Sequence, residues 1–167
     1  MIVAIRPESD SDRAAIAAVN AAAFPTAGEA KLVDRLRLDG DLLLSLVATK
    51  DDAVVGHVAF SRLTVAQGDE RSKAVALGPA AVLPRWQRRG LGAALIARGL
   101  EMLEAQGEAL VFVLGEPAFY RRFGFDVGEA AGFTSDYSGP YFQLLRLDDS
   151  KAASGRVHYP SAFAMVG

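Results

Sequence analysis

The chain has 167 residues, of which 51% are hydrophobic and 23% are charged, so it has the length and composition of one globular domain with a buried core. Its 18 lysines and arginines against 20 aspartates and glutamates leave a net charge of -2, which excludes a basic field over the whole surface that would bind nucleic acid or an anionic membrane. Cysteine is absent and only two histidines are present, which excludes disulfides and thiolate nucleophiles and disfavours a catalytic transition metal.

We therefore expect one soluble domain over residues 1–167. The apolar run from Met1 to Ile5 meets Arg6 and Pro7 at once, so it is too short for the apolar core of a signal peptide. No apolar run reaches the length of a membrane span. These observations favour a cytoplasmic protein with no membrane, nucleic-acid or metal partner.

The first half of the chain predicts two helices followed by a meander of antiparallel strands. Ser9 and Asp12 have the spacing of a helix N-cap and its acidic partner, and Pro25 ends the Ala-rich helix that follows. Apolar residues at helical spacing indicate a second helix, whereas apolar runs separated by polar turns indicate strands. In chain order we expect a strand at 1–5, a helix that ends before Pro25, a helix at about 29–38, and strands at 42–49, 53–65 and 73–83.

The second half predicts a pair of parallel strands joined by a helix. Helical periodicity from Gly90 to Gln106 lies between two apolar strands, so residues 73–114 are interpreted as a β-α-β unit. The stretch from Asp126 to Pro140 is rich in Gly, Ser and Asp, is long for a connection, and is predicted to be a binding loop or lid. The other elements expected are a strand at 109–114, one or two helical turns at 117–123, and strands at 141–147 and 156–159.

The turn between the first strand and the helix of this unit has the composition of an anion site. Gly90 and Gly92 lack a Cβ that would block a phosphate, the first N–H groups of the helix are unpaired, and Arg88 and Arg89 add positive charge. The alternative is that the glycines only permit a tight turn. The chain has no Walker sequence, and Leu95 takes the third small position of a dinucleotide fingerprint, so neither a nucleoside triphosphatase nor a Rossmann protein is favoured.

Two motifs lie on either side of this helix. Gln87-x-x-Gly90-x-Gly92 precedes it, and the apolar strand Val111–Leu114 after it leads to Phe119-Tyr120-Arg121-Arg122-Phe123-Gly124-Phe125. With both motifs in this order and separation, the chain resembles the GNAT superfamily of acetyl-CoA-dependent N-acetyltransferases over nearly its whole length. The resemblance implies an α/β (α+β) fold with a mixed, mostly antiparallel central sheet and a splayed pair of parallel strands.

The resemblance also implies acetyl-CoA as a co-substrate. In the family a backbone N–H near the end of the first parallel strand faces the thioester carbonyl, which by position implicates Val82. Pro79 cannot donate a ladder hydrogen bond and Gly78 permits irregular backbone, so we expect this strand to bulge and to part from its neighbour, which would admit the pantetheine. The turn expected to bind the pyrophosphate and to carry the motif comprises Gln87, Arg88, Arg89, Gly90, Gly92 and Ala93.

Tyr120 is implied as the proton donor to the departing CoA thiolate. A phenol with an ordinary pKa of about 10 can protonate a thiolate whose thiol has a pKa of about 8.5. The alternative role is aromatic packing beside Phe119 and Phe123. The chain departs from the family in one respect, because many members have an asparagine and a longer spacer where this sequence has Gly115-Glu116-Pro117-Ala118.

Neither motif identifies the general base. Residues 74–83 include no carboxylate and no histidine, so the proton of the amine must leave through water or through another segment. Glu29, at the start of the second helix, is the first candidate, and His57 is the second. For each there is a structural alternative, since Glu29 can complement a helix N-terminus and a lone strand histidine is often a hydrogen-bonded core residue.

Together these features predict an N-acetyltransferase that moves acetyl from acetyl-CoA to a primary amine of a small molecule or peptide. The alternative is a CoA-binding sensor or interaction module that keeps the fold without turnover. Dimers are common in the family, which makes a homodimer one option for the assembly. The sequence leaves open which amine is the acceptor and whether acyl groups other than acetyl are used.

Overall fold

The computed structural model describes residues 3–149 and 153–166, so Met1 and Ile2 of the expected first strand lie outside the described residues. The described chain forms one mixed eight-stranded sheet in the order β1-β2-β3-β4-β5-β7, with β8 beside β3 and β6 beside β8. The pairs β4–β5 and β6–β8 are parallel and the others are antiparallel, which confirms the expected fold class. The strands are β1 (Ala4–Pro7), β2 (Leu42–Lys50), β3 (Ala53–Gln67), β4 (Glu70–Val82), β5 (Leu110–Leu114), β6 (Phe133–Thr134), β7 (Phe142–Arg146) and β8 (Gly155–His158).

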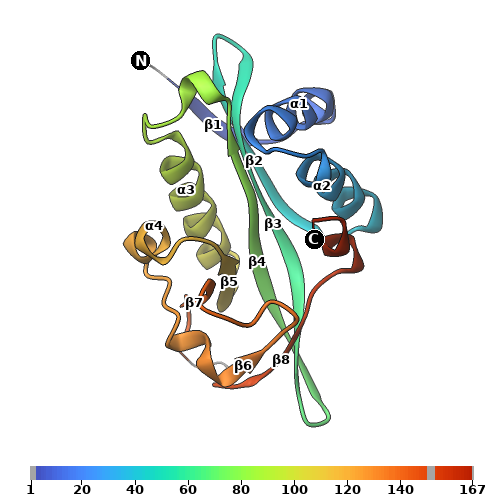
Figure 1. The fold of residues 1–167 in the computed structure, drawn as a ribbon, viewed down its shortest axis with the longest axis vertical. Helices are drawn as coiled ribbons and strands as arrows, with labels where there is room; N and C mark the ends of the chain where they lie inside the picture. Colours follow the sequence, from blue (N-terminus) through green and yellow to red (C-terminus); the bar gives the residue numbers. More distant parts are fainter. Residues whose placement is uncertain (1–2, 150–152, 167) are drawn as a thin grey trace.

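Helices cover both faces of the sheet (Figure 1). One face carries α1 (Arg13–Ala23) and α2 (Gly28–Asp39), and the other carries α3 (Leu91–Ala105). The strands contribute to both layers because successive side chains point to opposite faces. Val47 accordingly belongs to the buried cluster of Ile16 on α1, whereas the adjacent Leu46 belongs to that of Leu95 on α3. No helix in the described part of the chain is long and apolar enough to cross a membrane.

The sequence signals at the helix ends are confirmed. The Ser9 N–H donates to the Asp12 carboxylate at 2.7 Å in the 3-10 turn before α1. Gly40 ends α2 in the left-handed conformation, with a φ of 79°, which favours glycine. The short helical segments are η1 (Asp10–Asp12), η2 (Pro84–Trp86), α4 (Pro117–Tyr120), η3 (Arg121–Phe123), η4 (Glu129–Gly132) and η5 (Ser161–Met165).

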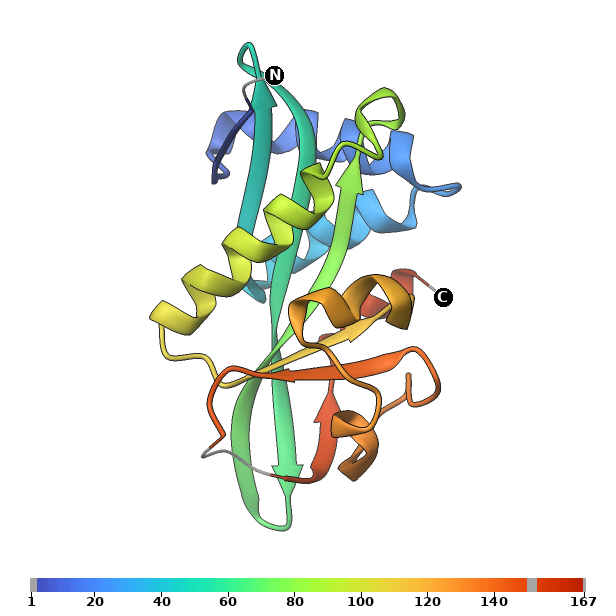
Figure 2. The ribbon, with the colours of Figure 1, turned by 90° about the vertical axis from the view of Figure 1, so that its left-hand side faces the viewer.

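The β4–β5 pair opens as the strands run toward their carboxyl ends, as expected. The parallel register extends from Val75 opposite Val111 to Leu77 opposite Val113 and then stops. On the other side of β4, Gly78 and Pro79 together oppose the single residue between the paired positions on β3, which is a β-bulge. The Gly78–Pro79 peptide is cis. Figure 2 shows β4 running away from β5 beyond this point.

The last third of the chain differs from the expectation in one stretch. The sequence predicts a loop over residues 126–140, but the structure forms η4 and β6 there. The sequence gives no sign of β6, because a two-residue strand is too short to show an alternating pattern. β6 pairs with β8, and β8 pairs in turn with β3, where Val157 lies opposite Val65. This pairing brings the C-terminal turn η5 against α2, far from it in sequence (Figure 1).

Candidate active site

The turn from β4 to α3 encloses a space of about 400 Å³, which we call the turn hollow. Gly90 caps α3 with a φ of 82°, and Arg88 also has a positive φ, of 63°. The first α3 amides have no partner within the helix and are available to an anion. The residues that line the turn hollow are Val82, Trp86, Gln87, Arg88, Gly90, Leu91, Gly92, Ala93, Phe119 and Arg122.

Six of the seven residues expected to bind the cofactor therefore line one space, and Arg89 does not. The Arg89 guanidinium instead lies over the Trp86 ring, 5.1 Å from its centroid. The sequence analysis missed Phe119 and Arg122, which reach the turn hollow from the helical segment after β5. The Arg122 guanidinium lies 4.5 Å from the centroid of Phe119, so the ring supports a positive charge at the rim. In the sequence, the pair Arg121 and Arg122 next to Tyr120 could have indicated this additional positive charge.

The end of β4 directs a backbone donor, the Val82 N–H, toward the opening between the strands. The Leu83 N–H donates to the Val55 carbonyl of β3 at 2.9 Å. Because N–H groups alternate in direction along a strand, the preceding Val82 N–H faces the opposite side, from which β5 has departed. The Gln87 amide donates to the Val82 carbonyl at 2.9 Å and so fixes the Val82–Leu83 peptide relative to the turn.

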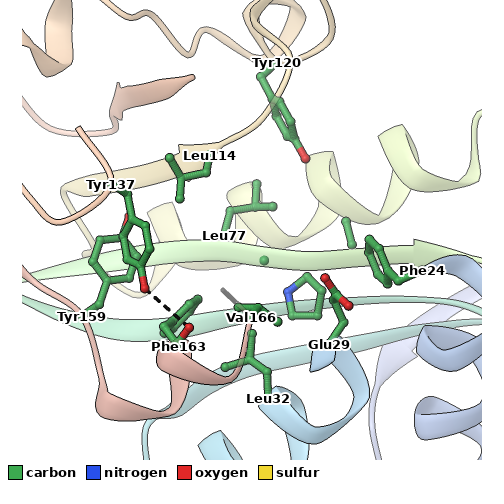
Figure 3. A pocket seen from close by; sticks show the side chains of 13 residues that line it. Phe24, Glu29, Leu32, Leu77, Leu114, Tyr120, Tyr137, Tyr159, Phe163 and Val166 are labelled. Atoms are coloured by element: carbon green, nitrogen blue, oxygen red, sulfur yellow. Dashed lines mark hydrogen bonds between the residues drawn. The ribbon is translucent and has the colours of Figure 1, made fainter. Parts of the chain in front are cut away.

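A second space of about 400 Å³ lies where the strands part, and we call it the β4–β5 cavity (Figure 3). Its residues come from segments that are distant in sequence: the α1–α2 region, the β4 bulge, the end of β5, α4, and the C-terminal part of the chain. They are Phe24, Glu29, Leu32, Leu77, Gly78, Pro79, Ala80, Leu114, Tyr120, Tyr137, Tyr159, Phe163 and Val166.

Tyr120 is held rigidly at the wall of the β4–β5 cavity and directs its hydroxyl inward (Figure 3). Its ring makes edge contacts with Phe119 and Phe125, with centroids 4.9 and 5.9 Å away. Gly115 is required beside the ring, because a Cβ at that position would collide with it. Burial raises the pKa of the Tyr120 phenol, so the group stays protonated and can act as an acid.

A buried glutamine that the sequence analysis missed fixes the short connection before Tyr120. Gln143 of β7 is fully buried, and its amide donates to the Gly115 carbonyl at 2.9 Å and to the Tyr141 carbonyl at 3.3 Å. This contact ties the β5–α4 connection to the sheet. The signal was a polar residue between the apolar residues Phe142 and Leu144.

Glu29 reaches the same cavity from the opposite wall (Figure 3). It lies in the first turn of α2. Its Oε1 is buried and has no hydrogen-bond partner among the described residues. The structure thus brings Glu29 and Tyr120, the two predicted catalytic side chains, to one cavity.

His57, the second candidate for the general base, is buried away from the β4–β5 cavity, which favours the structural alternative. The side chain is 0% exposed and does not line the β4–β5 cavity. Asn20 donates to Nδ1 at 3.1 Å, so the proton lies on Nε2, which is 2.9 Å from the Ser45 hydroxyl. Burial lowers the pKa of His57 to about 4 and keeps the ring neutral. No group of three or more potential ligands in the described residues could hold a metal ion.

Comparison with known proteins identifies relatives over almost the whole chain. A family model described as an acetyltransferase (GNAT) domain matches residues 4–128. The uncharacterized N-acetyltransferase YhbS of Escherichia coli K12 is 39% identical over 164 residues, which cover 95% of this chain and 97% of that protein. The crystal structure of YhbS in complex with CoA matches with a TM-score of 0.90 at 38% identity, covering 99% of this chain and 93% of that one. A GNAT family acetyltransferase from Brucella melitensis, in complex with acetyl-CoA, matches with a TM-score of 0.82 at 36% identity, covering 97% and 98%.

Proposed function

This chain belongs to the GNAT family of N-acetyltransferases, and we propose that it transfers the acetyl group of acetyl-CoA to a primary amine. The observation that carries this proposal is that neighbouring residues line the two spaces: Val82 and Phe119 line the turn hollow, and Ala80 and Tyr120 line the β4–β5 cavity together with Glu29. An anion site, a carbonyl-binding donor and two proton-transfer groups are the parts that acetyl transfer from a thioester requires. Relatives with CoA or acetyl-CoA bound support this cofactor.

We assign the cofactor contacts as follows. The amides of Arg88, Arg89, Gly90, Gly92 and Ala93 bind the pyrophosphate, with Gln87 holding the turn and Arg122 adding charge. The pantetheine lies along the bulge at Gly78 and Pro79. The Val82 N–H donates to the thioester carbonyl and stabilises the negative charge that develops there.

The reaction forms a carbon–nitrogen bond and breaks a carbon–sulfur bond. The neutral amine attacks the thioester carbonyl carbon, and Val82 stabilises the oxyanion. As the carbonyl re-forms, the sulfur departs and receives the Tyr120 hydroxyl proton. Glu29 accepts the proton that the nitrogen loses, and water then returns a proton to Tyr120.

Turnover tests the proposal against the alternative of a CoA-binding sensor. The protein is incubated with acetyl-CoA and a panel of primary amines, and both thiol release and the mass of the acetylated amine are measured. We expect thiol release that depends on an amine and matches the acetylated product one to one. Tight acetyl-CoA binding with no product over the whole panel would establish the sensor instead.

A further inference from the structure

The β4–β5 cavity has a distinctive composition for a site that accepts an amine. Among the described residues that line it, Glu29 is the one with a charged side chain, and the other large side chains are aromatic or branched aliphatic. We infer that the acceptor is a small amine with a single positive charge on an aromatic or branched apolar body. The inference rests on the proposed function, because the cavity receives the acceptor only if acetyl is delivered beside the β4 bulge.

The tyrosines of the cavity add no second charge. Burial raises the pKa of Tyr120 and Tyr159, and burial together with the neighbouring Asp136 raises that of Tyr137. All three therefore stay neutral phenols at physiological pH. The electrostatic field inside the cavity comes from Glu29 alone among its lining residues.

The Glu29 carboxylate is incompletely satisfied until a ligand binds. A buried carboxylate oxygen without a hydrogen bond is costly, and a cationic donor is the partner that offsets the cost best. A protonated amine supplies that donor, loses one proton to the same oxygen, and attacks after Glu29 has passed this proton to water. The cavity has one such anchor, so it matches one ammonium group.

Aromatic residues build the wall beside this anchor. The Tyr159 ring makes edge contacts with Tyr137 at 4.8 Å and with Phe163 at 5.1 Å, measured between centroids. The Tyr137 hydroxyl donates to the Phe163 carbonyl at 3.5 Å, which turns its polar end toward the chain (Figure 3). These three residues and Val166 lie outside residues 4–128, so the wall comes from a part of the chain that the family model does not match.

Size and polarity both argue against larger polar acceptors. A space of about 400 Å³ is near the lower end of the ~300–1,000 Å³ typical of small-molecule sites, and the acetyl group takes part of it together with the pantetheine that we place along Gly78 and Pro79. Polyamines and aminoglycosides carry further ammonium or hydroxyl groups. Each would be desolvated against aromatic walls without a charged partner, which is unfavourable.

The first experiment compares probes that differ in body and charge. These are 2-phenylethylamine, ethylamine, 1,4-diaminobutane, an aminoglycoside and a lysine-containing peptide. We expect kcat/KM for 2-phenylethylamine to exceed that for ethylamine by roughly 10- to 100-fold, because one aromatic group is buried. It should also exceed the kcat/KM for each of the polycations. A higher kcat/KM for the diamine, the aminoglycoside or the peptide would overturn the inference.

Binding separates this inference from the proposed function. Calorimetry measures the affinity of 2-phenylethylamine for the CoA-loaded protein and for the CoA-loaded Glu29→Gln variant. Binding that weakens in the variant, without turnover in the parent, would support the inference and overturn acetyl transfer. Turnover of a polycation without binding of 2-phenylethylamine would support acetyl transfer and overturn the inference. Absence of both binding and turnover of 2-phenylethylamine would also overturn it.

A matched pair of variants tests the single-charge argument. Val166→Glu adds a second carboxylate to the cavity, whereas Met165→Glu adds the same charge to the adjacent residue, which is 47% exposed and does not line it. We expect Val166→Glu to raise the kcat/KM ratio of 1,4-diaminobutane to 2-phenylethylamine by roughly tenfold, and Met165→Glu to leave it within about twofold. Thermal unfolding confirms that both variants fold. Equal ratios in the two folded variants would overturn the inference.

Discussion

The turn hollow and the β4–β5 cavity have similar volumes, about 400 Å³ each, and are built in opposite ways. Eight of the ten residues that line the turn hollow come from one short run, residues 82–93, which includes two glycines and the first turn of α3. The β4–β5 cavity consists of side chains that five separate parts of the chain bring together. One space offers positive charge and the other a single carboxylate.

This difference separates a constant ligand from a variable one. A pyrophosphate is the same in every reaction, and a contiguous turn can recognise it through N–H groups that do not depend on side-chain identity. An acceptor differs between enzymes, so its site benefits from walls that can change without disturbing the turn. The C-terminal residues Tyr159, Phe163 and Val166 are such a wall, since none of them lines the turn hollow.

Tyr120→Phe should have the largest effect of the variants that test this comparison. It removes the hydroxyl that faces the β4–β5 cavity and leaves the ring packed against Phe119 and Phe125. We expect kcat to fall by roughly 10²- to 10³-fold with acetyl-CoA affinity unchanged, because only proton transfer to the sulfur is lost. Steady-state kinetics and calorimetry provide the two measurements.

Tyr141→Phe is the matched control for this loss. The Tyr141 side chain is 56% exposed and lines neither space, so the same deletion should leave kcat unchanged. Full turnover by Tyr120→Phe at saturating acceptor, across the alkaline range where the unprotonated thiolate leaves readily, would show that water supplies the proton.

His57 allows a test of which titratable groups belong to the cavity. Its pKa is about 4 in the folded protein against about 6.5 for an exposed histidine, so the unfolded chain binds the additional proton between these pH values. The folded state should therefore lose about 3 kcal/mol at this residue as pH falls from 6.5 to 4. Denaturant unfolding measured across this range gives the slope.

His57→Gln should flatten that slope, since a glutamine amide does not titrate. His158→Gln makes the same replacement at an exposed position of β8 and is the matched control. The dependence of kcat on pH should be the same in both variants. A pH dependence of kcat that changes in His57→Gln alone would show that this histidine takes part in the reaction.

Gly92→Val tests the turn hollow directly. An added Cβ would lie 3.8 Å from the nearest other heavy atom, a Val82 side-chain carbon, so the fold has room for it while the phosphate does not. We expect acetyl-CoA affinity to fall by about 10- to 100-fold, the value of one or two charge-assisted hydrogen bonds. Calorimetry measures the affinity.

Ala97→Val introduces the same side chain on the exposed side of the same helix, outside the lining of the turn hollow, and is the control. It should bind acetyl-CoA as the parent does. Unchanged affinity in a folded Gly92→Val protein would mean that the pyrophosphate does not approach the backbone here.

The sequence was informative where local chemistry determines the structure. Gly90 and Gly92 with Arg88 predicted the turn, and Gly78 with Pro79 predicted the bulge, because each depends on what a few consecutive residues can or cannot do. Glu29 and Tyr120 were also predicted, with the help of a family resemblance, and the structure brings both to one cavity.

The aromatic wall could not be predicted in the same way. Tyr137 and Phe163 meet only because β8 pairs with β3 and β6, and long-range pairing of short strands leaves little periodic signal. The sequence could not decide between Glu29 and His57 as the base either. A single histidine in a strand gives the same sequence pattern whether its side chain faces a cavity or the core.

Arg122→Ala should have the smallest effect, and it tests whether the turn hollow extends beyond the contiguous turn. Arg122 lines the hollow from η3, whereas the neighbouring Arg121 is also exposed and does not line it. An exposed cation near a phosphate contributes modestly, so we expect acetyl-CoA affinity to fall by about 3- to 10-fold in Arg122→Ala and to be unchanged in Arg121→Ala. Since exposed charges are screened by salt, the difference between the two variants should shrink when calorimetry is repeated at high ionic strength. Equal affinities at low ionic strength would confine phosphate binding to residues 82–93, and the hollow would then be recognised by the turn alone.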